Sequence, residues 1–135
     1  MELRRFHRVK CMSPGELIHH DITYRCRLEN VSLKGALISA DECIMVPLGE
    51  TCTFSLNLQP GAPPLIITVT VVHCFFSMIG VKFVGFTGDA EQRLLALLKE
   101  TTPEPVKLVE EWELIQRERA DREEELEAFP AAAAS

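Results

Sequence analysis

The sequence predicts a mainly β fold, a small barrel or sandwich of short strands followed by helices. Apolar and polar residues alternate with a period of two in several segments before residue 87. Turn residues separate these segments at intervals of roughly 8–12 residues, which is typical of small all-β domains. Beyond residue 89 the apolar spacing changes to that of an amphipathic helix.

Five strands are predicted from the alternation and the turn signals. They span residues 18–28, 36–38, 52–58, 65–74 and 78–86. The first ten residues of the chain are basic overall and carry few structure signals. Within the first predicted strand, His19 and His20 are expected on opposite faces, because neighbouring side chains of a strand point in opposite directions. Asn30 and Gly35 bracket the turn that follows, and residues 60–64 form a proline-rich loop.

Two helices are predicted after the strands. The first spans residues 90–100 and begins with a capping box formed by Asp89 and Gln92. Its apolar face should cover one opening or edge of the barrel. The second helix spans residues 106–128, and its later part is rich in glutamate and arginine, which is typical of an exposed helix.

Length and charge limit the domain organisation and the partners. The 135 residues suit one domain with a real core, which we place at residues 1–102, followed by an acidic helical extension over residues 103–135. The net charge of −6 argues against a DNA- or RNA-binding surface, which would be broadly basic. The N-terminus is nevertheless locally basic, so an anion site is compatible with the acidic whole.

The cysteines and histidines give no sign of a metal or catalytic site. The five cysteines form no CxxC pair, and neither a signal peptide nor an apolar stretch of membrane-spanning length is found. We therefore expect reduced thiols in a cytoplasmic protein. No His or Cys pair has zinc-finger spacing, and His73 and Cys74 should face apart on a strand. No cofactor is expected.

Two short motifs stand out. Residues 4–8, RRFHR, contain the spacing RxxxR, and residues 30–35, NVSLKG, contain the spacing [DN]xSxxG. Residues 80–83, GVKF, are similar to the Gly-x-x-Phe of a late strand. In this order, ahead of a run of strands, the motifs resemble the PilZ family, whose members bind the bacterial second messenger cyclic di-GMP. The resemblance covers residues 4 to about 100 and implies an antiparallel Greek-key β-barrel.

The resemblance implies six ligand-binding residues. They are Arg4, Arg5, Arg8, Asn30, Ser32 and Gly35. Arginine carries a permanent charge and a planar fork of donors, which suits phosphate oxygens and the O6 and N7 acceptors of guanine. Asn30 and Ser32 would reach a guanine edge. Gly35 would permit a positive φ or a close approach of the ligand.

The resemblance implies a stand-alone cyclic di-GMP receptor rather than an enzyme. No nucleophile–base set or phosphate loop is present in the sequence. Ligand binding would order a mobile N-terminal arm and change contacts with a protein partner. The alternative is a PilZ-like adaptor that does not bind nucleotide. The helix of residues 106–128 could also form a homodimer through Leu108, Trp112 and Ile115.

Overall fold

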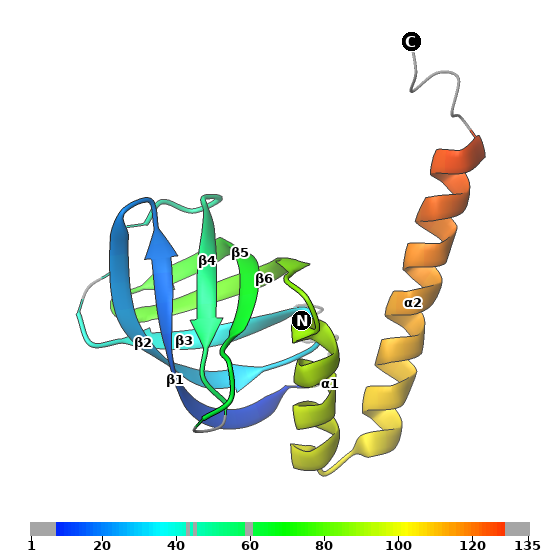
Figure 1. Cartoon of the computed structure of the whole chain (residues 1–135), viewed down its shortest axis with the longest axis horizontal. Helices are drawn as coiled ribbons and strands as arrows, with labels where there is room; N and C mark the ends of the chain where they lie inside the picture. The colour runs from blue at the N-terminus through cyan, green and yellow to red at the C-terminus, as the bar shows by residue number, and fades with distance from the viewer. Residues whose placement is uncertain (1–7, 43, 45, 59–60, 129–135) are drawn as a thin grey trace. The chain divides into compact units, whose positions relative to one another are not determined.

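The computed structural model describes residues 8–42, 44, 46–58 and 61–128, with side chains described as far as residue 122. The chain divides into two compact units, Met1–Thr102 and Pro103–Ser135. The described part of the first unit is a closed antiparallel barrel with one helix (Figure 1). The second unit contains helix α2 (Pro105–Ala128).

The barrel is built from six strands within the described residues. They are β1 (Val9–His19), β2 (Ile22–Val31), β3 (Gly35–Ala40), β4 (Thr51–Leu56), β5 (Leu65–Phe75) and β6 (Met78–Phe86). Their order around the barrel is β1-β2-β3-β6-β5-β4, and β4 closes the barrel against β1. Three consecutive strands, β4 to β6, form a meander, and β3 lies beside β6 after a long connection, which is a Greek-key arrangement. The predicted mainly β Greek-key barrel is confirmed.

The first predicted strand is wrong in one respect, because residues 18–28 are a hairpin and not a single strand. β1 ends at His19, a turn occupies residues 20 and 21, and β2 starts at Ile22. The buried positions are odd-numbered up to His19 and even-numbered from Tyr24 to Leu28. A two-residue turn reverses the chain and shifts the alternation, so Ile18, which was predicted on the apolar face, is not part of the core. Ile22 lies next to the turn at the start of β2 and is 53% exposed.

The turn also overturns the predicted separation of the two histidines. His20 has φ of +56°, which is a left-handed backbone conformation, and it no longer belongs to the strand that His19 ends. The two imidazole rings lie 4.1 Å apart between centroids. The rule that neighbours face apart holds only within an extended strand.

The N-terminal segment is more regular at its end than the sequence suggested. β1 already begins at Val9, and its first two residues pair with the end of β2 as Val9↔Val31 and Lys10↔Asn30. Pro14 lies within β1, one residue before the ladder with β4 begins at Gly15, where a missing N–H is tolerated. Pro14 and Gly15 had concealed this strand.

The core of the barrel is apolar and draws on every strand. Fully buried large side chains of the first unit are Leu17, Leu28, Val31, Ile38, Phe54, Leu56, Leu65, Ile67, Ile79, Leu94 and Leu98. Leu94 and Leu98 come from helix α1 (Ala90–Thr101). The strand residues stand at alternate positions, as a barrel with one inward face requires, except that a bulge in β2 separates Leu28 from Val31. The outward positions are therefore available to build a binding surface.

Helix α1 (Ala90–Thr101) confirms the first predicted helix and packs against β5 through its buried Leu94 and Leu98. Arg93 Nη2 donates a hydrogen bond of 2.7 Å to the carbonyl oxygen of Pro63, which ties the helix to the loop before β5. The predicted capping box is wrong, because the side chain of Asp89 makes no capping hydrogen bond. Helix α2 confirms the second predicted helix and begins at Pro105, where proline's fixed φ suits the first helical turn. None of the described helices is long and apolar enough to cross a lipid bilayer.

Candidate ligand site

The two predicted motifs meet at one point of the barrel surface. Arg8 Nη1 donates a hydrogen bond of 2.9 Å to Asn30 Oδ1. The contact arises because the start of β1 pairs with the end of β2, so that Arg8 lies one residue before Val9↔Val31. Since only the oxygen of an amide can accept from a guanidinium, the contact also fixes the orientation of the Asn30 amide. Its NH₂ group remains available as a donor.

Ser32 shapes the turn between β2 and β3. Its side chain is buried, with 2% of the residue exposed. Its Oγ accepts from the backbone N–H groups of Lys34 and Gly35, each at 3.2 Å, and donates to the carbonyl oxygen of Gly35 at 3.3 Å. A hydroxyl has one donor and two acceptor positions, so the turn uses all of them. The hydroxyl therefore organises the turn from within, and the guanine contact that the resemblance implied for Ser32 stays a prediction.

Gly35 has a packing role within the barrel, while the predicted close approach of the ligand stays a prediction. Its φ is not positive, and the group that approaches it closely belongs to the barrel. A Cβ at this position would lie 2.4 Å from the carbonyl oxygen of Val81, because β3 begins here against β6 with Gly35↔Lys82. Glycine is needed at this position so that the two strands can pair closely.

Two adjoining hollows on the outer surface of β2, β3, β5 and β6 share Arg8, and we call them together the Arg8 site. The larger has a volume of about 500 Å³ and is lined by Arg8, Asn30, Ala36, Leu37, Val72, His73, Gly80 and Val81. The smaller has a volume of about 180 Å³ and is lined by Arg8, Ser32, Lys34, Gly35, Val72, Val81 and Lys82. The larger hollow is within the usual size of small-molecule sites.

The charge of the Arg8 site is positive although the chain is acidic. Arg8, Lys34 and Lys82 contribute cationic groups, and no acidic side chain lines the hollows among the described residues. Three cations around a concave surface favour an anionic ligand. Of the other predicted site residues, Arg4 and Arg5 lie outside the described residues.

Two lining residues of the larger hollow were not predicted as site residues. His73 of β5 and Gly80 of β6 are cross-strand partners. A Cβ on Gly80 would come within 3.1 Å of the Cβ of His73, so the glycine leaves room beside the imidazole. The motif that includes Gly80 indicated a strand, but only the pairing of β5, β6 and β3 brings both residues beside Asn30.

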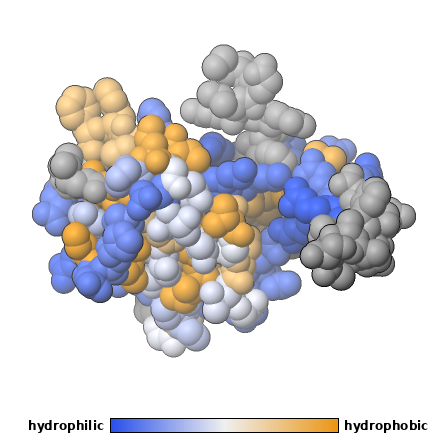
Figure 2. Space-filling view, turned by 90° about the horizontal axis from the view of Figure 1, so that it is seen from above, coloured by the Kyte–Doolittle hydropathy of each residue, from blue (hydrophilic) through white to orange (hydrophobic). Residues whose placement is uncertain are grey.

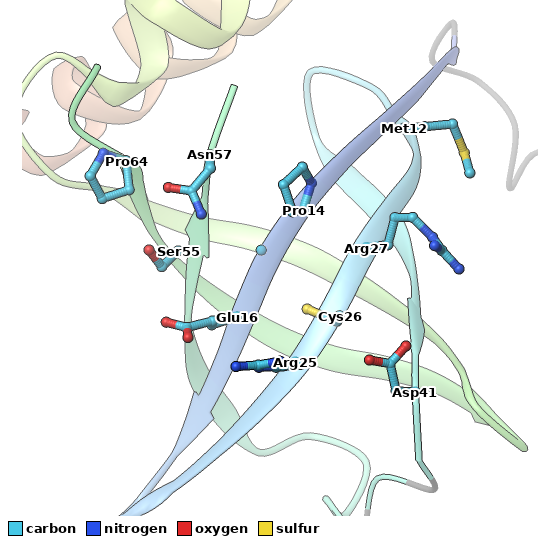
Figure 3. Close-up of a pocket in the computed structure, with 11 residues that line it drawn as sticks. Met12, Pro14, Glu16, Arg25, Cys26, Arg27, Asp41, Ser55, Asn57 and Pro64 are labelled. Atoms are coloured by element: carbon cyan, nitrogen blue, oxygen red, sulfur yellow. The ribbon is translucent and has the colours of Figure 1, made fainter. Parts of the chain in front are cut away.

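Another hollow, which we call the second hollow, has a volume of about 570 Å³ and is lined mainly by residues of β1, β2 and β4 (Figure 3). In the closed barrel, β1 lies between β2 and β4. The charged lining of the second hollow is mixed, with Glu16 and Asp41 beside Arg25 and Arg27. Figure 3 shows Glu16 and Arg25 next to each other, as expected for the cross-strand pair that they form. A surface of balanced charge is less suited to a dianionic ligand than the Arg8 site.

The buried thiols are poor nucleophiles. Burial, with a smaller effect of Glu16, raises the pKa of the Cys26 thiol from 9.0 to about 12. Burial likewise raises the pKa of Cys52, with Glu50 adding to the effect. The reactive species is the thiolate, so both groups are inert near neutral pH. The four described cysteines, Cys11, Cys26, Cys52 and Cys74, are free thiols.

Comparison with known families gives one match. The model of the PilZ domain matches residues 2–100. This range includes both motifs and every strand of the barrel. Among curated proteins, no significant sequence match is found.

Solved structures share the fold at low sequence identity. The PilZ domain of Escherichia coli YcgR with c-di-GMP aligns with a TM-score of 0.63 and 15% identity over 87% of this chain and 97% of that one. The Bacillus subtilis inhibitor of motility MotI/DgrA aligns with a TM-score of 0.61 and 13% identity over 72% of this chain, which spans only 49% of that protein. The PilZ domain of CeSA from a cellulose-synthesizing bacterium aligns with a TM-score of 0.53 and 15% identity, covering 67% of this chain and 93% of that one.

Proposed function

Because the chain belongs to the PilZ domain family, as its motifs indicated, we propose that it is a cytoplasmic receptor for cyclic di-GMP and binds this ligand at the Arg8 site. The observation that carries the proposal is the hydrogen bond between Arg8 and Asn30, which joins the two motifs at the rim of a hollow of about 500 Å³. The likeness to the YcgR domain, whose structure contains c-di-GMP, supports the choice of ligand.

The chemistry of Arg8 and Asn30 suits a guanine dinucleotide. A guanidinium donates through several N–H groups, so Arg8 can keep Asn30 in place while it also faces a phosphate or a purine. Asn30 then presents its NH₂ group as a donor. Guanine offers two acceptors, O6 and N7, on its Hoogsteen edge, whereas adenine has a donor in place of O6. The pair therefore favours guanine over adenine.

The remaining motif residues, Ser32 and Gly35, support the backbone on which Asn30 stands. Ser32 fixes the backbone of the turn, and Gly35 lets β3 start directly against β6. Both residues also line the smaller hollow, so the predicted close approach of the ligand to Ser32 and Gly35 stays part of the proposal. Lys34 and Lys82 add positive charge on the side of the smaller hollow. Arg4 and Arg5 would supply further cations from the segment ahead of β1.

Ligand binding would order the segment ahead of β1 and change the contacts that this segment and the neighbouring surface make with a protein partner. We place the protein partner at the β5–β6 hairpin, where Phe75 and Phe76 are 61% and 77% exposed. Val72, which is 55% exposed, lines both hollows and connects this hairpin to the Arg8 site. Figure 2 shows hydrophobic side chains (orange) reaching the surface among hydrophilic ones (blue). Exposed aromatic residues are enriched in protein interfaces.

The proposal is tested by isothermal titration of the full chain with cyclic di-GMP and, separately, cyclic di-AMP. We expect saturable heat with cyclic di-GMP and a weaker response with cyclic di-AMP. Arg8→Ala should weaken binding by roughly ten- to a hundredfold, since a charge-assisted hydrogen bond contributes about 1.5–3 kcal/mol.

Arg25→Ala is the matched control. It removes an exposed arginine from the second hollow and leaves the Arg8 site intact. Binding should be unchanged in this variant. If Arg25→Ala weakened binding as much as Arg8→Ala, the ligand would be bound elsewhere or by charge alone. Absence of heat at high ligand concentration would favour the adaptor that does not bind nucleotide.

A further inference from the structure

Two histidines and a glutamate meet at one end of the barrel, and none of them lines the Arg8 site. His19 ends β1, His20 occupies the turn to β2, and Glu50 directly precedes β4. One potential ligand atom from each residue lies within 4.8 Å of the other two. Figure 1 shows the β1–β2 turn and the start of β4 at the same end of the barrel.

The distances within this cluster are those of a metal site that requires little movement. His19 Nε2 is 3.0 Å and His20 Nε2 is 3.9 Å from the same oxygen, Glu50 Oε1. In a tetrahedral zinc site with bonds of about 2.0–2.2 Å, neighbouring ligand atoms are roughly 3.3–3.6 Å apart. The two observed distances lie on either side of this value, so small side-chain rotations would complete the geometry.

The backbone holds the three side chains in this arrangement. The pair His19↔Ile22 closes the hairpin, and His20 takes φ of +56°, a conformation that costs energy for a residue with a Cβ. Glu50 is fixed on both sides of its peptide, because its N–H donates to Pro47 at 3.2 Å and its carbonyl accepts from Val71 at 3.0 Å. The arrangement is therefore set by the fold.

Exposure of the cluster increases from one residue to the next. The side chain of His19 is 11% exposed, that of Glu50 is 45% exposed and that of His20 is 77% exposed. One ligand is thus embedded in the barrel, while the other two reach solvent and leave an ion a path to enter. A hydrogen bond joins His19 to Glu50, and the left-handed φ that the two-residue hairpin requires brings His20 within 3.9 Å of the same oxygen.

We propose that His19, His20 and Glu50 bind a divalent transition-metal ion, with Zn²⁺ as the ion to test first. Two imidazoles and one carboxylate suit zinc and its neighbours, whereas magnesium and calcium prefer oxygen ligands alone. The fourth position would hold water. The ladder between β1 and β4 ends at Ile18↔Thr53, so the ion would join the hairpin to the start of β4 beyond the last strand pair. The site is independent of the proposed nucleotide binding.

The test is a titration of the metal-free full chain with Zn²⁺, followed by calorimetry, thermal melting and NMR of the histidine side chains. We expect one equivalent to bind, the melting temperature to rise, and the ring resonances of His19 and His20 to shift while those of His73 do not. His20→Ala and Glu50→Gln should each weaken Zn²⁺ binding by about tenfold or more. Glu50→Gln preserves an acceptor for His19, so it tests the metal and not the hydrogen bond.

His73→Ala is the control for unspecific histidine binding and should bind Zn²⁺ as the wild type does. Replacing Zn²⁺ with Co²⁺ reports on the ligands, because a thiolate ligand would produce a charge-transfer absorption band. The proposal is overturned by any of three results: no saturable binding, binding that survives in both His20→Ala and Glu50→Gln, or a thiolate band with Co²⁺.

Discussion

Replacing Gly35 with alanine should destabilise the barrel strongly. The added Cβ would lie 2.4 Å from the carbonyl oxygen of Val81, about 1 Å closer than the 3.4 Å at which ordinary contact begins. The obstructing atom belongs to the backbone of β6, so it cannot rotate away. β3 and β6 must separate, which strains the pair Gly35↔Lys82 and the neighbouring hydrogen bond of 2.8 Å from the Phe83 N–H to the Lys34 carbonyl.

The cost should be at the upper end for overpacked sites, about 2–3 kcal/mol. For a unit of about 100 residues, that lowers the melting temperature by roughly 10–20 °C. The assay is thermal unfolding followed by circular dichroism.

Gly80→Ala is the matched comparison, because its Cβ would lie 3.1 Å from the Cβ of His73, a side chain that can shift by a few tenths of an ångström. Gly80→Ala should therefore cost less than about 1 kcal/mol in stability but weaken cyclic di-GMP binding, since the methyl group enters the larger hollow. The packing role of Gly35 is refuted if Gly35→Ala melts within about 2 °C of the wild type.

Three further predictions rest on described contacts, and a fourth concerns the segment ahead of β1. Asn30→Ala should reduce the preference for cyclic di-GMP over cyclic di-AMP by roughly tenfold, as measured by paired titrations; an unchanged ratio would contradict the role of the Asn30 amide. Ser32→Ala should lower the free energy of unfolding by about 1–3 kcal/mol in denaturant melts, because two turn N–H groups lose their acceptor; Ser39→Ala, at a partly exposed position, is the comparison. The free energy of unfolding should fall as pH rises from 9.0 to about 12, by at most about 1.4 kcal/mol per pH unit from Cys26, since the folded state keeps the thiol proton that the unfolded chain releases; Cys26→Ala should show a shallower decline. Amide exchange of residues 3–8 should slow on adding cyclic di-GMP, and equal rates with and without ligand would contradict the proposed output through this segment.

The alternation of apolar and polar residues predicted much of the barrel. It failed at the β1–β2 turn, where the alternation continues without a break. The alternation from Ile18 to Leu28 continues through the hairpin, because the polar residues at positions 19–21 fit both a strand and a turn. The positive φ of His20 has no strong sequence signal, since it replaces the Asn or Gly that such turns prefer. β1 was hidden by Pro14 and Gly15, which a strand tolerates only at particular ladder positions.

The candidate site divides in the same way between local and long-range information. The two motifs are each local, and the family that they resemble implied that Arg8 and Asn30 serve the same ligand. The roles of Ser32 and Gly35 depend on the inside of a turn and on a strand 46 residues further along the chain, as shown by Gly35 and Val81. His73 and Gly80 reach the Arg8 site only through the pairing of β5, β6 and β3, which no local pattern encodes.

The most direct test of the account is NMR mapping of cyclic di-GMP onto the amide resonances of the full chain. We expect the largest shifts at Arg8, Asn30, Leu37, His73 and Gly80, which are among the residues that line the larger hollow. Shifts concentrated instead at Glu16, Arg25 and Asn57, which line the second hollow, would contradict the placement of the ligand. A spectrum that does not change at saturating cyclic di-GMP would contradict the receptor function itself.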